Sequence, residues 1–118
     1  MSDLGIEDAV LDSLDALVDV LRENQRRNNQ AIARAELTRA RRLEGASYRD
    51  IVESAQGPLI VELATESLAA LMLAAGRLRR AEADALHAEG MTMERIAELY
   101  GVTRQRVSAL LRSRSSAA

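Results

Sequence analysis

The chain of 118 residues has no cysteine, no phenylalanine and no tryptophan, and only one proline and one histidine. The absence of cysteine excludes disulfide bonds and thiolate metal sites. A single histidine, His87, cannot supply a zinc site or a catalytic triad from its own side-chain type. The carboxylates are spread along predicted helices and no Gly-rich phosphate loop is present, so we expect no enzymatic activity, no cofactor and no metal.

Aromatic residues make up 2% of the chain, whereas 47% of it is hydrophobic, so the core must consist of aliphatic side chains and methionine. Such residues, with few glycines and prolines, favour helices over strands, and we expect an all-α fold. The longest apolar region, Leu59–Leu78, is interrupted by Glu62, Glu66 and Arg77, which argues against a membrane span. The first residues do not resemble a signal peptide, and we expect a cytoplasmic protein.

Charge is distributed unevenly along the chain, although the net charge is only −2. Residues 1–23 hold seven acids and one arginine, whereas residues 91–118 hold five arginines and two acids. Lysine is absent. The basic end is compatible with a nucleic-acid partner, and the acidic end would then lie away from that partner.

Residues 6–27 have apolar side chains three and four positions apart, which predicts an amphipathic helix with a narrow, coiled-coil-like stripe. The stripe consists of Ile6, Val10, Leu14, Leu17, Val18 and Leu21. Its partner is either a second copy of the chain or the rest of the same chain. The polar residues 24–30 either continue this helix or break it before a second helix over residues 31–43. Six arginines in residues 26–42 either contact DNA phosphate or pair with the acidic first helix.

Ser47, followed three residues later by Asp50, predicts the start of a short helix over residues 48–55. Pro58 suits the first turn of the next helix, Leu59–Ala75. That segment is apolar on most sides, so it is expected to be a core helix, a dimer interface, or both. We assign residues 1–75 to a helical scaffold that also dimerises, and residues 76–118 to a separate helical region.

The segments Glu44–Val52 and Glu89–Ala97 resemble each other: each has an acid, a glycine, a hydroxyl residue and a short amphipathic helix. The similarity ends after Val52, because Gly57 and Pro58 have no counterpart in the second segment. It is either a degenerate repeat of a helix-turn-helix or a coincidence between common helix starts.

The sequence pattern of residues 77–114 predicts three helices, and the last two form a helix-turn-helix over Met93–Arg112. Thr92 and Thr103 suit the N-cap positions of those two helices. Ala97 stands where crossing helices approach closely, and Gly101 supplies the left-handed turn residue. The inward positions of the unit are Ile96, Tyr100, Val102, Val107, Leu110 and Leu111.

This pattern resembles the helix-turn-helix of bacterial transcription regulators and, more closely, the segment of sigma factors that reads the −35 promoter element. The resemblance is confined to the last third of the chain, from the predicted helix at Arg77 onward, and nothing before it looks like the other regions of a sigma factor. It implies a small actinobacterial-type regulator with a sigma-like module.

The resemblance implies that the start of the helix near Thr103 enters the major groove of double-stranded DNA. Arg104, Gln105 and Ser108 would then read bases, and Ala109 would meet a thymine methyl group. The implied DNA-binding residues are Thr92, Thr103, Arg104, Gln105, Arg106, Ser108, Ala109 and Arg112. We therefore predict a nucleoid-associated, homodimeric transcription regulator. The alternative is a protein-interaction module that binds RNA polymerase or another regulator without reading DNA.

Overall fold

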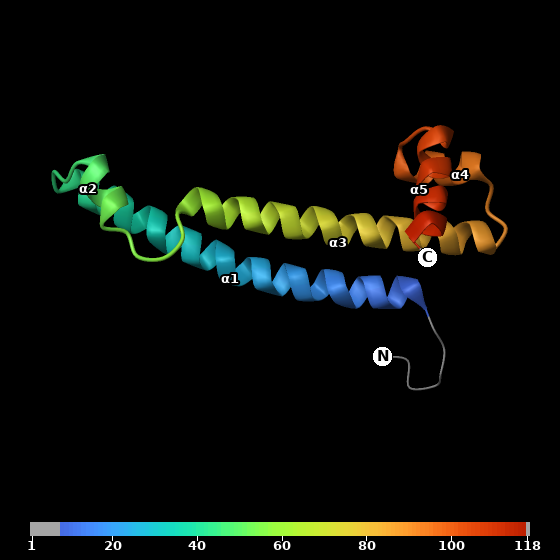
Figure 1. The fold of residues 1–118 in the computed structure, drawn as a ribbon, viewed down its shortest axis with the longest axis horizontal. Helices are drawn as coiled ribbons and strands as arrows, with labels where there is room; N and C mark the ends of the chain where they lie inside the picture. Colours follow the sequence, from blue (N-terminus) through green and yellow to red (C-terminus); the bar gives the residue numbers. More distant parts are fainter. Residues whose placement is uncertain (1–7, 118) are drawn as a thin grey trace. The chain divides into compact units, whose positions relative to one another are not determined.

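The computed structural model describes residues 8–117, and for residues 113–117 it describes the backbone alone. The expected all-α class is confirmed, and Figure 1 shows the helices in chain order. They are α1 (Ala9–Leu43), α2 (Tyr48–Glu53), α3 (Ile60–Ala88), α4 (Met93–Tyr100) and α5 (Arg104–Ala117). Within the described residues, none of these helices combines the length and apolar character that crossing a membrane requires.

The chain divides into two compact units. Unit 2 is the continuous segment Val18–Met72, which holds most of α1, all of α2 and the start of α3. Unit 1 combines Met1–Leu17 with Leu73–Ala118, and therefore contains α4, α5 and the second half of α3. The two long helices, α1 and α3, thus contribute residues to both units.

Helix α1 is a single helix of 35 residues. The interpretation of residues 24–30 as a helical continuation is therefore confirmed, whereas Ile6 and Glu7 of the predicted helix lie outside the described residues. The polar stretch stays helical because it contains neither glycine nor proline, and its side chains find partners. Asn24 is buried, and its carbonyl oxygen Oδ1 accepts a hydrogen bond from Arg27 at 2.8 Å.

Helix α3 is likewise continuous over 29 residues, so the predicted end of one helix at Ala75 and start of another at Arg77 is wrong. Gly76 lies inside the helix and does not have a positive φ. One interior glycine costs a helix about 1 kcal/mol relative to alanine. The helical residues on both sides of Gly76 outweigh this cost. Helix α2 ends at Glu53 with Ser54 as its C-cap, slightly before the predicted end at Ala55.

In unit 2, α1 and α3 pack antiparallel through a contact that is partly polar. The side-chain amide of Asn24 donates to the carbonyl oxygen of Ser67 at 3.0 Å, and Arg27 forms an ion pair with Glu66 at 3.6 Å. The Ser67 hydroxyl is buried and has no hydrogen-bond partner among the described residues. Only Leu63 and Ile51 are buried apolar side chains in this unit, so its own core is thin.

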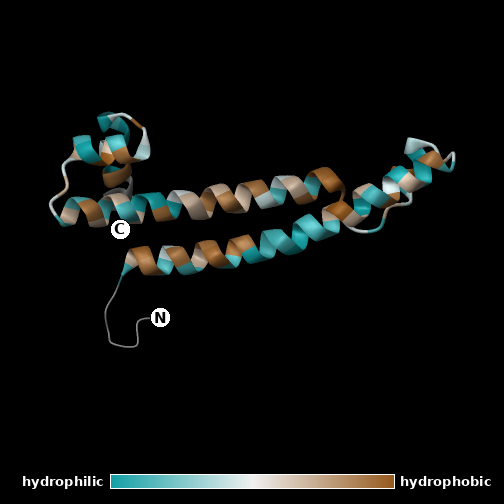
Figure 2. Cartoon of the chain, turned by 180° about the vertical axis from the view of Figure 1, so that it is seen from behind, coloured by the Kyte–Doolittle hydropathy of each residue, from teal (hydrophilic) through white to brown (hydrophobic). Residues whose placement is uncertain are grey.

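The apolar residues at the start of α3 are largely exposed. Figure 2, coloured by hydropathy, shows where hydrophobic stretches lie along the ribbon. Val61, Leu68 and Met72 are 74%, 59% and 66% exposed, and Leu73 is 57% exposed. Of the two alternatives for residues 59–75, a core helix or a dimer interface, burial in a core is therefore not found for these side chains within the single chain. Two antiparallel helices make one layer, and they bury only the stripe along which they meet.

Unit 1 contains a compact core where the end of α3, α4 and α5 meet. Its buried members are Ala83, Ile96, Ala97 and Val107, and partly buried side chains such as Leu86 and Val102 pack around them. The inward positions predicted for Ile96, Ala97, Val107 and Leu110 are confirmed. The burial of Ala83, on α3, was not predicted. Ala83 has no exposure because α4 and α5 approach α3 closely at this point, which only a small side chain permits.

Candidate nucleic-acid interface

Helix α4 begins and ends at the predicted residues. The Thr92 hydroxyl accepts a hydrogen bond from the Arg95 amide at 3.2 Å, so Thr92 is the N-cap. Gly101 ends the helix with φ 64° and ψ 35°, in the left-handed region that a residue with a β-carbon enters only at a cost. Its amide bonds back to Glu98, and the next amide, that of Val102, donates to Ala97 at 3.0 Å. This sharp turn lets the chain start a new helix within three residues.

Helix α5 starts with the same kind of cap. The Thr103 hydroxyl accepts from the amide of Arg106 at 3.1 Å, which satisfies one of the free amides of the first turn. One side of the helix is held by Val107, which is fully buried, and by Leu110. The opposite side is left for other contacts.

Four of the predicted DNA-binding residues line one hollow on the exposed side of α5. Arg104, Gln105, Ser108 and Arg112 surround a volume of about 440 Å³. Positions 104, 105, 108 and 112 follow the helical repeat, so they share one face. Two guanidinium groups, an amide and a hydroxyl on one face can together engage phosphates and base edges.

The other predicted residues lie elsewhere. Arg106 is exposed, but two positions along the helix rotate it by roughly 200° from Arg104. Ala109 is half-buried, and neither it nor Arg106 lines the hollow. Thr92 and Thr103 are exposed N-caps outside it.

Within the hollow, Arg104 and Ser108 already have partners in the folded chain. Nε of Arg104 forms an ion pair with Oε1 of Glu94 at 3.0 Å, and both side chains are exposed. The Ser108 hydroxyl points toward the sulfur of Met93, 3.7 Å away. An exposed ion pair contributes only about 0–1 kcal/mol, so Arg104 can exchange Glu94 for another anion at little cost.

Tyr100 joins α4 to α3 through a polar contact that sequence reasoning missed. Its hydroxyl donates to Oε1 of Glu82 at 3.2 Å, and the guanidinium of Arg79 lies 5.9 Å from the ring centroid. Burial, together with the negative charge of Glu82, raises the pKa of Tyr100 to about 12. The contact fixes the end of α4 next to the turn, and the sequence signal for it was only a tyrosine at an inward position.

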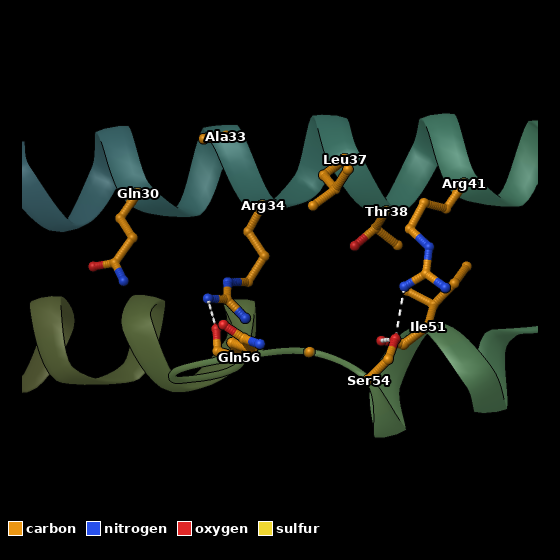
Figure 3. Close-up of a pocket in the computed structure, with 10 residues that line it drawn as sticks. Gln30, Ala33, Arg34, Leu37, Thr38, Arg41, Ile51, Ser54 and Gln56 are labelled. Atoms are coloured by element: carbon orange, nitrogen blue, oxygen red, sulfur yellow. Dashed lines mark hydrogen bonds between the residues drawn. The ribbon is translucent and has the colours of Figure 1, made fainter.

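Unit 2 contains a second groove, of about 460 Å³, where α1 meets α2 and the segment after it. Figure 3 shows Arg34 and Arg41 reaching across it from α1. Arg34 donates to the carbonyl oxygen of Gln56, and Arg41 donates to the Ser54 hydroxyl at 2.7 Å. These arginines hold the segment after α2 against α1, a role that neither alternative for the arginine cluster anticipated.

The remaining arginines of the cluster mostly have local partners. Arg26 forms an exposed ion pair with Glu23 one turn earlier on the same helix. Arg42 donates to the carbonyl oxygen of Ala46 at 3.2 Å and lies 4.4 Å from the ring centroid of Tyr48. The cluster therefore serves largely to hold α1 and its following turn together.

His87 lies near the end of α3, with Nδ1 3.4 Å from the carbonyl oxygen of Met91. Among residues 8–117, no three histidine or acidic side chains are grouped closely enough to hold a metal ion.

Comparison with protein-family models, with curated proteins and with solved structures finds no match to this chain.

Proposed function

We propose that this protein is a DNA-binding transcription regulator that acts as a homodimer and associates with the nucleoid in the cytoplasm. Helix α5 is the recognition helix and inserts its exposed face into the major groove. The observation that supports this most directly is the hollow on α5, where Arg104, Gln105, Ser108 and Arg112 share the side opposite the buried Leu110.

The side chains around the hollow suit a division of work on DNA. Arg104 and Gln105, at the start of the helix, have the donors that guanine and adenine edges require. Arg112, two turns later, suits a phosphate. A homodimer doubles these contacts, and its two half-sites would be separated by about 34 Å, one turn of DNA.

The test starts from a randomised duplex library, because the target sequence is unknown. The protein selects bound duplexes, and the enriched sequence is then used in fluorescence anisotropy titrations at several salt concentrations. Wild-type affinity should fall steeply with salt, since phosphate contacts release counterions. Arg104→Ala and Gln105→Ala should each weaken binding by about 10- to 100-fold while circular dichroism remains unchanged.

Arg49→Ala is the matched control. Arg49 is also an exposed arginine in the first turn of a hydroxyl-capped helix, where it pairs with Glu53 at 3.1 Å, but that helix is α2. Its replacement should leave the affinity unchanged. Equal loss in Arg49→Ala and Arg104→Ala would indicate a general charge effect and contradict the assignment of α5.

Glu94→Gln sharpens the assignment further. It frees Arg104 from its ion pair and removes a negative charge beside the hollow, so DNA affinity should rise about threefold. If no duplex is enriched while the protein retains RNA polymerase from solution irrespective of Arg104, the protein-interaction alternative replaces the proposal.

A further inference from the structure

The long helices of unit 2 have a second apolar stripe beside the one along which they meet. The positions of α1 that face α3 include Val20 and Asn24. The second stripe begins one residue after each of them, at the exposed Leu21 and Gln25. Val18, Leu21 and Ile32 repeat at coiled-coil spacing and are 41%, 46% and 55% exposed. We call this group, together with Val61, Leu68 and Met72 of α3, the open face.

The two halves of the open face lie on the same side of the helix pair. On α3, Leu68 follows the buried Ser67 just as Leu21 follows the half-buried Val20 on α1. One residue is a rotation of about 100°, in the same sense for each helix seen from its own start. Because α1 and α3 run antiparallel, these rotations turn both stripes toward one side. The result is a two-helix layer with one apolar side.

We propose that a second copy of this chain covers the open face, so that two α1–α3 pairs pack face to face as a four-helix bundle. A layer of two helices lacks the second layer that a core requires. Unit 2 buries only Ile51 and Leu63 as apolar side chains, whereas the open face leaves six aliphatic or methionine side chains accessible. A second copy supplies a surface of the same size and the same aliphatic character.

Charge complementarity favours a second copy as the occupant. The open face of α1 follows a heptad repeat through Val18, Leu21 and Ile32, and the exposed Arg22 and Glu36 lie beside it, two heptads apart. Face-to-face packing about a two-fold axis stacks helices antiparallel, either α1 on α1 or α1 on α3. The first arrangement places Arg22 of each copy beside Glu36 of the other when the axis passes midway between these two positions.

This inference rests on the homodimer in the proposed function, but it does not depend on DNA binding. Sedimentation equilibrium of the full chain without DNA should give a dimer. Leu68→Glu should give a monomer that remains helical by circular dichroism. Leu73→Glu is the matched control, because Leu73 is on the same helix and is equally exposed, but it lies roughly 140° around from Leu68. This variant should remain a dimer.

Leu68→Ala covers the case in which the glutamate variant does not fold. Each dimer loses two leucine side chains from the interface, so the dimer dissociation constant should rise about 100-fold. A monomeric wild type, or equal dissociation of the Leu68→Glu and Leu73→Glu variants, would overturn the inference. The Arg104→Ala variant should remain a dimer, so failure of the bundle and failure of DNA recognition are distinguishable.

Discussion

The ends of α1 and α3 lead into closely similar turns, but only the turn after α3 leads into a fully buried core. Gly45 and Gly90 have φ values of 104° and 100°. Ser47 and Thr92 then cap the next helices with nearly equal dihedral angles, φ −74° and ψ 152° against φ −72° and ψ 155°. The similarity predicted between the two segments is therefore present in the local structure.

The two regions differ in the helices that come after the cap. Helix α2 has six residues and buries only Ile51, which is 5% exposed, and the chain then passes through Pro58 to α3. Helix α4 is followed by Gly101 and α5, and together they enclose Ile96 with no exposure at all. Capping signals specify where a helix starts, whereas a buried core depends on a third helix that closes over it.

The largest expected effect comes from removing the central isoleucine of each region. Ile96→Ala should lower the free energy of unfolding by about 3–4 kcal/mol, because a fully enclosed site cannot collapse around the missing atoms. Ile51→Ala should cost about 2 kcal/mol, because its neighbours border an open groove and can relax. Chemical denaturation followed by circular dichroism measures both values. A larger loss for Ile51→Ala would reverse the comparison between the regions.

A smaller and equal effect is expected at the two caps. Ser47 accepts from the Asp50 amide at 3.1 Å, and Thr92 accepts from the Arg95 amide at 3.2 Å, so both variants lose one such bond. Ser47→Ala and Thr92→Ala should each lower stability by about 1 kcal/mol. The same denaturation experiment applies, with Ser47→Thr and Thr92→Ser as controls that retain the hydroxyl. Clearly unequal losses would show that the turns differ in more than their surroundings.

Much of unit 1 could be predicted from the sequence because its signals are local. The N-caps Thr92 and Thr103 and the turn residue Gly101 were identified by residue type and spacing, and the structure confirms them. The hollow on α5 follows from helical periodicity once α5 is placed. The role of that hollow in DNA binding remains a proposal.

Unit 2 was less predictable because its long helices depend on contacts distant in sequence. The polar stretch around Asn24 is compatible with a break, but a bond to Ser67, 43 residues later, helps to keep it in the helix pair. The apolar start of α3 is typical of a core helix, but Leu68 and Met72 are exposed in the single chain. Composition shows which side chains need to be covered but not which element covers them.

The two tyrosines, one in each region, allow the subtlest comparison. Tyr48 lies against Arg42, whereas Tyr100 is partly buried and donates to Glu82, which raises the pKa of Tyr100 to about 12. The pKa of Tyr100 in the folded chain is then above the ordinary value near 10 that applies to the unfolded chain. The neutral phenol therefore stabilises the folded state fully below about pH 10, and this stabilisation is lost as the pH rises from about 10 to about 12.

Absorbance titration of the tyrosinate band tests this directly, since each single-tyrosine variant reports one region. In Tyr48→Phe, the remaining tyrosine should titrate near pH 12. In Tyr100→Phe, the transition near pH 12 should disappear. The variant should also lose less stability than the wild type as the pH rises above 10. Glu82→Gln should move the transition of Tyr100 downward, because a neutral amide no longer opposes the phenolate. If Tyr100 titrated near pH 10 in the folded Tyr48→Phe protein, the contact between α3 and the end of α4 would be absent in solution.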